Sequence, residues 1–209
     1  MLDVYIFQDW KFCEKEMNES IITNQERRYI QNYGNGRESI LSLLLVKSVL
    51  GKVEIWRDER GKPFLVNDER FVNWSHNEDY WVLAVSREGP VGVDIESLGI
   101  DYQEEMYGWI LHDEEKERMK QGVKFPEIWT RKEAYVKYLG LGMNEEMNKW
   151  SSFDKDFIKS FKFKNAVISV CAEKIDKINV YVDGYITEDG EEIQSEVQWY
   201  KFRRKNRMI

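Results

Sequence analysis

The spacing of apolar residues predicts both helices and strands in the first half of the chain. Leucines recur with helical spacing after Arg37, and the pattern stops at Gly51, a residue type that often ends helices. Two apolar runs, 80–85 and 91–95, flank the turn-forming segment 87–90, and we expect them to form a β-hairpin. The predicted elements are a strand over 1–7, a helix from Thr23 or Asn24 to Tyr33, a helix over 37–50, a strand over 53–56 and the two hairpin strands.

The second half is predicted to begin with helices and to end with strands. Pro126 suits the first turn of a helix, because its missing N–H would be unpaired there, and Gly140 suits the end of that helix. This order predicts an α+β fold built from two lobes of similar size, residues 1–97 and 98–209. The predicted elements are a helix over 103–120, a helix around Pro126 that ends at Leu139, and strands over 157–163, 167–172, 178–182 and 196–202.

Two carboxylates lie at the outgoing end of the second hairpin strand. Because side chains alternate along a strand, Asp94 and Glu96 point to one face, opposite the apolar face of Val93 and its neighbours. Two ionised carboxylates about 4 Å apart repel by roughly 1 kcal/mol in water and about 4 kcal/mol at an effective dielectric near 20. A cation between them would remove this cost. The alternative is that both side chains point to solvent at the strand end.

A second pair of candidates lies on the predicted helix around Pro126. Glu133 and Lys137 are four residues apart and therefore share one face of the helix. The same spacing is that of an ordinary surface ion pair, worth about 0.2–0.5 kcal/mol, and Lys132 can equally be a solvated charge. If Glu133 meets the two strand carboxylates in a cleft, three carboxylates and a lysine would hold a hard divalent cation and a phosphate ester.

Composition narrows the classes of partner. The chain has 209 residues, and its hydrophobic fraction of 42% is ample for a packed core. A formal net charge of −7 argues against non-specific binding to nucleic acid, which usually leaves a basic signature. Two cysteines, Cys13 and Cys171, are too few for a disulfide framework. The first residues lack the basic start of a signal peptide. The apolar run 40–46 is too short to span a bilayer. We therefore expect a cytoplasmic protein with no membrane or nucleic-acid partner.

The remaining motifs restrict the chemistry further. His76 and His112 do not have the spacing of a zinc site, and a lone histidine is more often a hydrogen-bonding residue than a ligand. Oxygen ligands without histidine or thiolate favour Mg²⁺. Lys62 lies in a turn between Gly61 and Pro63 that would hold its ammonium outward, and a solvated loop lysine is the simpler alternative. The sequence contains no GxxxxGK[ST] phosphate loop and no GxGxxG, GxSxG or HExxH motif.

Four ordered segments together resemble the 4′-phosphopantetheinyl transferases of the Sfp type, which prime carrier domains of nonribosomal peptide and polyketide synthases. The last two segments match the family pattern throughout, and their combination is highly specific. The resemblance covers roughly residues 20–145. The segments are Gly61-Lys62-Pro63, Asn73-Trp74-Ser75-His76, Gly92-Val93-Asp94-Ile95-Glu96 and Trp129-Thr130-Arg131-Lys132-Glu133-Ala134-Tyr135-Val136-Lys137.

This resemblance implies an Mg²⁺-dependent transfer of phosphopantetheine from coenzyme A to a serine of an apo acyl or peptidyl carrier protein, with release of adenosine 3′,5′-bisphosphate. It also implies a monomer with a pseudo-twofold pair of α/β lobes and an active site in the cleft between them. By position, Asp94, Glu96 and Glu133 would hold Mg²⁺. Glu133 would also be the base for the carrier serine, and Lys137 would stabilise charge on the transferring phosphate. The implied nucleotide contacts are Lys62, Ser75, His76, Lys132, Arg27, Arg28 and Arg37.

The chain departs from the family pattern in three places. Trp74 replaces a smaller apolar residue, a change that we expect to alter the adenine pocket. Glu78 and Asp79 bring two acids next to the implied phosphate site, and the segment 140–143 lacks the lysine often found there. Two other classes of function stay open. One is a noncatalytic relative that binds coenzyme A or a carrier as a scaffold, and the other is a different Mg²⁺-dependent phosphotransferase reached by convergence. For carrier binding, we expect an apolar patch over 102–109 or after Leu139.

Overall fold

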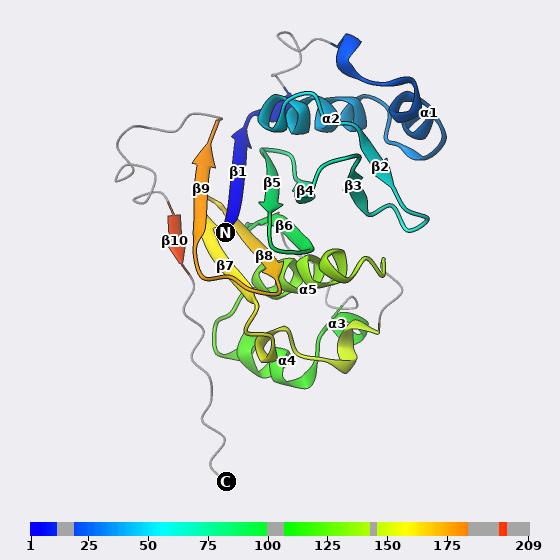
Figure 1. Cartoon of the computed structure of the whole chain (residues 1–209). Helices are drawn as coiled ribbons and strands as arrows, with labels where there is room; N and C mark the ends of the chain where they lie inside the picture. Colours follow the sequence, from blue (N-terminus) through cyan, green and yellow to red (C-terminus); the bar gives the residue numbers. More distant parts are fainter. Residues whose placement is uncertain (12–18, 100–106, 143–145, 184–196, 200–209) are drawn as a thin grey trace.

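The structure is a computed structural model that describes residues 1–11, 19–99, 107–142, 146–183 and 197–199, and it confirms the α+β class (Figure 1). The strands are β1 (Leu2–Gln8), β2 (Ile55–Arg57), β3 (Pro63–Leu65), β4 (Phe71–His76), β5 (Tyr80–Ser86), β6 (Val91–Ser97), β7 (Ile158–Phe163), β8 (Ala166–Ala172), β9 (Ile178–Val182) and β10 (Val197–Trp199). The helices are α1 (Asn24–Tyr33), α2 (Arg37–Leu50), α3 (Tyr107–Ile110), α4 (Asp113–Lys120) and α5 (Phe125–Leu139), with short 3-10 turns η2 (Glu19–Ile21), η4 (Met147–Lys149) and η5 (Ser152–Asp154).

The bounds of α1, α2 and α5 follow the sequence signals. The Thr23 hydroxyl accepts a hydrogen bond from Glu26 N at 3.2 Å, and the Glu26 carboxylate accepts one from Thr23 N at 2.8 Å, which caps α1. α2 ends at Gly51. α5 has Pro126 in its first turn and ends at Gly140, whose φ of 70° favours a residue without Cβ. The predictions for these three helices are confirmed.

The predicted helix over 103–120 is wrong as a single element, because α3 and α4 are separate helices with His112 between them. The His112 Nδ1 accepts a hydrogen bond from Glu114 N at 3.3 Å, and the backbone N–H of His112 donates to Glu115 Oε2 at 2.9 Å. This reciprocal cap starts a new helix. The predicted start, residues 103–106, lies outside the described residues.

The strands form two four-stranded sheets and a two-stranded ribbon. The first sheet has the order β4-β5-β1-β9, the second has the order β10-β7-β8-β6, and β2 pairs with β3 in the ribbon. β1 pairs antiparallel with β5 and parallel with β9, while β6 and β7 both pair antiparallel with β8. The lobe boundary at residue 97 stays a prediction, and strands from both sides of it share a sheet.

The predicted hairpin is wrong, because its two strands belong to different sheets. β5 pairs with β1 and β4, whereas β6 pairs with β8, so that Asp94 lies opposite Ser169. The segment 87–90 therefore carries the chain from one sheet to the other. Apolar spacing identifies a strand, but the partner of a strand depends on packing with distant segments.

The two sheets pack against each other, and helices cover their outer faces (Figure 1). On β5, Val82 and Ala84 lie in the core between the sheets, while Trp81 and Leu83 lie in the core against α2. The Trp81 indole N–H donates to the hydroxyl of Ser42 on α2 at 3.2 Å. α5 packs on β6 and β8, on the other side of the second sheet. Burial on both faces explains the continuous apolar sequence of β5.

β6 approaches α5 very closely at Gly92. A Cβ atom at this position would lie 2.0 Å from the Ala134 carbonyl oxygen and 2.5 Å from Tyr138 N. Both neighbours are helix backbone atoms, which cannot move aside one at a time. A larger residue at position 92 would therefore push the whole of α5 away from β6.

We expect Gly92→Ala to lower the free energy of unfolding by about 1–3 kcal/mol or more, because the added methyl group overpacks the contact between β6 and α5. The measurement is chemical denaturation of the variant and the wild type. Gly108→Ala is the matched control, because a Cβ at Gly108 meets nothing within 4 Å. Equal free energies of unfolding for the two variants would show that the close approach at Gly92 does not limit the stability of the protein.

Candidate active site

Three elements bring polar side chains together where β4, β6 and α5 meet. Asp94 on β6 accepts hydrogen bonds at Oδ1 from Lys137 Nζ on α5 at 2.6 Å and from Ser75 Oγ on β4 at 2.7 Å. Lys137 Nζ also donates to Ser75 Oγ at 3.0 Å. Asp94 is only 5% exposed. The structure therefore joins residues from separate predicted segments into one cluster.

Strand alternation explains how this cluster forms. Val93 lies in the core between the sheets, so its neighbours Gly92 and Asp94 face the α5 side of β6. On β4, Asn73 and Ser75 share a face, and the Asn73 side-chain oxygen accepts a hydrogen bond from Val93 N at 3.0 Å. This side-chain bond joins strands of two different sheets and fixes β4 next to β6. Ser75 is thereby held against Asp94.

Glu133 lies beside this cluster and is 9% exposed. Its pKa is raised from an ordinary value near 4.5 to about 7, chiefly by burial and also by the negative charges of Asp94 and Glu96, against the opposing charge of Lys137. Glu133 Oε1 and Asp94 Oδ2 are both buried without a hydrogen-bond partner. A carboxyl group with such a pKa can accept a proton near neutral pH.

The donor atoms fit a hard divalent cation. Two buried carboxylate oxygens without partners, one on Asp94 and one on Glu133, are the kind of ligand that Mg²⁺ takes. Glu96 is half-buried and close enough to raise the pKa of Glu133. Within the described ranges, however, no group of three or more His, Cys, Asp or Glu side chains is already arranged to hold a metal ion. The Lys137 ammonium forms an ion pair with Asp94 at 2.6 Å.

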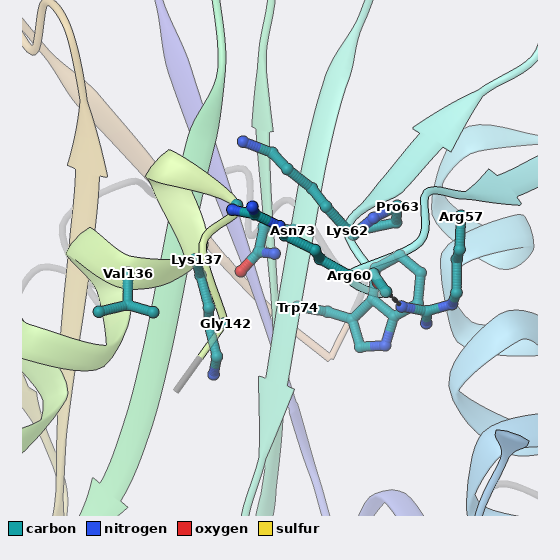
Figure 2. A pocket seen from close by; sticks show the side chains of 11 residues that line it. Arg57, Arg60, Lys62, Pro63, Asn73, Trp74, Val136, Lys137 and Gly142 are labelled. Atoms are coloured by element: carbon teal, nitrogen blue, oxygen red, sulfur yellow. Dashed lines mark hydrogen bonds between the residues drawn. The ribbon is translucent and has the colours of Figure 1, made fainter. Parts of the chain in front are cut away.

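A basic hollow of about 180 Å³ opens beside the cluster (Figure 2). Its wall includes Lys137, Lys62, Arg57 and Arg60. Lys62 Nζ donates to the backbone oxygen of Tyr138, and partial burial lowers the pKa of Lys62. The turn lysine thus bends toward α5, and the hollow is suited to an anionic ligand.

A second hollow of about 330 Å³ adjoins the first. His76, Tyr29 and Glu38 line it, and Arg57 and Trp74 line both hollows. His76 packs on Trp10 with ring centroids 4.6 Å apart. The two hollows therefore share part of their walls and form neighbouring subsites beside β4.

Comparison with known proteins agrees with this geometry. The family model of the 4′-phosphopantetheinyl transferase superfamily matches residues 90–185. The chain is 34% identical over 137 residues to the 4′-phosphopantetheinyl transferase gsp of Aneurinibacillus migulanus, a match that covers 58% of this chain and 55% of the relative. By these two matches, the chain is similar to the 4′-phosphopantetheinyl transferases, with the family model covering somewhat less than half of its length.

Two further relatives are less similar. The chain is 25% identical over 168 residues to the 4′-phosphopantetheinyl transferase ffp of Bacillus subtilis, covering 70% of this chain and 73% of the relative. It is 27% identical over 151 residues to the L-aminoadipate-semialdehyde dehydrogenase-phosphopantetheinyl transferase of Candida glabrata, covering 66% of this chain and 55% of the relative. The chain thus spans little more than half the length of the Aneurinibacillus and Candida relatives.

The structure contradicts the nucleotide contact that the superfamily pattern implied for Lys132. This lysine is fully buried, pairs with Glu115 Oε2 at 3.0 Å and donates to the carbonyl oxygens of Met147 at 2.6 Å and Trp150 at 2.7 Å. Its three donors are thus all used inside the protein. Lys132 stabilises the segment after α5 and is not part of the site.

Two of the implied N-terminal arginines already have an acidic partner. Arg27 donates to the backbone oxygen of Glu19 at 2.6 Å, and the Glu19 carboxylate accepts from Arg37. Arg28 is exposed on α1. None of these three arginines lines either hollow, so their nucleotide role stays a prediction.

Three residues beside the cluster, Arg57, Arg60 and Asn73, were not predicted from the sequence. The two arginines lie near the turn at Gly61, which was the sequence signal for them. Asn73 lies in the segment Asn73-Trp74-Ser75-His76, but no role was assigned to it. The Glu78 carboxylate, which the sequence places next to the implied phosphate site, forms a surface ion pair with Lys11 Nζ at 2.5 Å.

In the described part of the chain, no helix has the length and apolar character needed to cross a membrane.

We expect Lys132→Met to lower the free energy of unfolding by about 3–5 kcal/mol, because it leaves Glu115 buried without its cation. Chemical denaturation measures this change. Lys116→Met is the control, since Lys116 pairs with Asp113 at the surface and its loss should leave stability unchanged. A stable Lys132→Met protein with weakened binding of coenzyme A would instead restore the nucleotide role.

The raised pKa of Glu133 predicts a pH-dependent stability in metal-free buffer. Between about pH 4.5 and pH 7 the folded state keeps the Glu133 proton while the unfolded state has lost it, so wild-type stability falls as pH rises through this window. Glu133→Gln removes this fall. We expect its stability relative to wild type to improve by on the order of 2–3 kcal/mol across the window. Denaturation curves of both proteins that stay parallel over these pH values would contradict the shift, and Glu117→Gln at the surface is the control.

Proposed function

We propose that this protein transfers 4′-phosphopantetheine from coenzyme A to a serine of an apo acyl or peptidyl carrier protein and releases adenosine 3′,5′-bisphosphate. The observation that carries the proposal is the meeting of Asp94, Ser75, Glu133 and Lys137 beside a basic hollow. The match of residues 90–185 to the superfamily model and the printed names of the relatives support the same activity. The enzyme would be a holo-carrier-protein synthase.

Asp94, Glu96 and Glu133 would hold Mg²⁺, which when bound neutralises charge on the pyrophosphate of coenzyme A and polarises its phosphorus. Glu133 accepts the proton of the carrier serine hydroxyl. The serine oxygen forms a bond to the phosphorus of the phosphopantetheine arm as the bond to the bridging pyrophosphate oxygen breaks. Lys137 then stabilises negative charge on the phosphate oxygens and on the leaving group.

The remaining contacts concern the nucleotide. Lys62 lines the hollow next to Lys137, where it would meet the pyrophosphate. Ser75 and His76 follow each other on β4 and so face opposite sides of this strand, His76 toward the second hollow. We assign the nucleotide to that side. Arg27 and Arg37 would act on the nucleotide only if they exchange Glu19 for phosphate, and Arg28 would act from its exposed place on α1.

The wider setting is also part of the proposal. We infer a pseudo-twofold pair of lobes, residues 1–97 and 98–209, with the active site between them, in a cytoplasmic monomer that serves nonribosomal peptide or polyketide synthesis. Trp109 and Leu139 are 47% and 38% exposed and are candidates for the apolar patch that binds the carrier, whereas 102–106 lies outside the described residues. Burial of exposed apolar side chains suits an acidic carrier better than whole-molecule attraction to an acidic enzyme.

The test is the intact mass of a purified apo carrier protein after incubation with this protein, Mg²⁺ and coenzyme A. We expect the carrier to gain one phosphopantetheine group. Glu133→Gln and Asp94→Asn should slow the transfer at least ~100-fold, because they remove the proton acceptor and a metal ligand. A chelator should stop the wild-type reaction.

Glu117→Gln is the matched control, because Glu117 is an exposed carboxylate on α4 that pairs only with a surface lysine. It should react like the wild type. Coenzyme A binding without transfer to several unrelated carriers would favour the noncatalytic scaffold. ATP turnover without release of adenosine 3′,5′-bisphosphate would favour a different phosphotransferase.

A further inference from the structure

The last residue of β6 is held by a side chain that comes from the first sheet. Asn77 Nδ2 donates a hydrogen bond to the Ser97 hydroxyl oxygen at 3.2 Å. Asn77 directly follows β4 of the first sheet, whereas Ser97 ends β6 of the second sheet. In the described part of the chain, β6 lies at the edge of its sheet and pairs with β8. The Asn77 bond therefore joins the two sheets at the point where β6 ends.

Other hydrogen bonds fix Asn77 itself. Its Oδ1 atom accepts bonds from Asp79 N at 3.0 Å and from Tyr80 N at 2.8 Å. Its backbone oxygen accepts a bond at 3.0 Å from the indole N–H of Trp10, which is fully buried. Because the two backbone donors occupy the oxygen end of the amide, the Nδ2 end is the one that faces Ser97. The turn after β4 thus presents the Asn77 amide in one orientation.

A second contact holds the residue that follows Ser97. Leu98 N donates to the backbone oxygen of Asn165 at 2.8 Å, in the turn between β7 and β8. Asn165 Oδ1 in turn accepts a bond from the hydroxyl of the buried Tyr80 at 2.6 Å. Since Tyr80 is also bonded to Asn77, these contacts form a closed ring around the end of β6. The ring uses groups from both sheets.

Glu96 directly precedes this ring. Because side chains alternate along β6, Ser97 points away from the face that carries Asp94 and Glu96. The negative charge of Glu96 helps to raise the pKa of Glu133, so these two carboxylates lie close together. The end of a strand opens more easily than its middle unless it is anchored. A shift of Ser97 would therefore move Glu96 relative to the other two carboxylates.

We infer that Asn77 and Ser97 are positioning residues that hold the Glu96 carboxylate in place for a divalent cation. The inference rests on the proposed function only through its metal site, and it requires neither the carrier nor coenzyme A. Neither residue lines the two hollows. Loss of the bond between them should therefore weaken metal binding and leave the binding of coenzyme A without metal unchanged.

The test compares affinities for Mn²⁺, a spectroscopic substitute for Mg²⁺, by electron paramagnetic resonance in the absence of coenzyme A. Ser97→Val removes the hydroxyl that accepts the Asn77 bond. Ser97→Thr is the matched control, because it keeps a hydroxyl on a side chain of the same shape, and both residues suit a strand. We expect Ser97→Val to bind Mn²⁺ roughly 10-fold more weakly than wild type, and Ser97→Thr to stay within about twofold of it.

A second measurement separates positioning from a general loss of structure. Ser97→Val should keep the wild-type affinity for coenzyme A in metal-free buffer, where a merely structural role would lower it. Unfolding midpoints show whether each variant is folded. Tyr80→Phe opens the ring at its bond to Asn165 without changing β6, so it should also weaken Mn²⁺ binding. It provides the test if Ser97→Val does not fold.

The outcomes separate the possible failures. Equal Mn²⁺ affinities of Ser97→Val and Ser97→Thr would overturn the inference, and so would a wild type that binds no Mn²⁺. Parallel losses of Mn²⁺ and coenzyme A affinity in Ser97→Val would overturn it as well, because the bond would then support only the fold. Mn²⁺ binding that depends on the hydroxyl, in a protein that never modifies a carrier, would support the inference and contradict the proposed transferase.

Discussion

The close approach of β6 to α5 at Gly92 is the constraint on which the rest of the site depends. Because this position has no Cβ, the helix backbone at Ala134 can lie directly on the strand. Glu133 precedes that contact along the helix, and Asp94 follows it along the strand two residues later. The same packing brings Lys137 within 2.6 Å of Asp94. One missing side chain thus determines the distance between the acid-bearing strand and the helix that faces it.

The site differs from two other buried ion pairs of the described residues. In the pairs Glu26–Lys47 and Glu115–Lys132, backbone groups complete the hydrogen bonds of the charged side chains. At the site, Asp94 and Glu133 each keep a buried oxygen without a partner. Two unpaired carboxylate oxygens in one cluster cost stability, and a ligand bound there would offset that cost.

Several side-chain contacts join strands and helices that are distant in sequence. Asn73 bridges two sheets through its side chain, since its oxygen accepts a hydrogen bond from Val93 N. Arg57 joins the ribbon strand β2 to Trp74 on β4 and to Tyr29 on α1. Because of these contacts, side chains from several elements line the hollows. A ligand that fills them would interact with both the ribbon and α5 and would strengthen their association.

The sequence alone determined the α+β class, the bounds of α1, α2 and α5, and the candidate cluster of Asp94, Glu133 and Lys137. The class and the helix bounds follow from local rules, because capping, glycine, proline and side-chain periodicity act within a few residues of the chain. The cluster, in contrast, was expected from the resemblance of two distant segments to a known family. The separation of β5 and β6, the burial of Lys132 and the contacts of Arg57 with Trp74 and Tyr29 were decided only by the tertiary structure. Strand partners, burial and ion pairing depend on which distant segments pack together, and no local pattern records that choice.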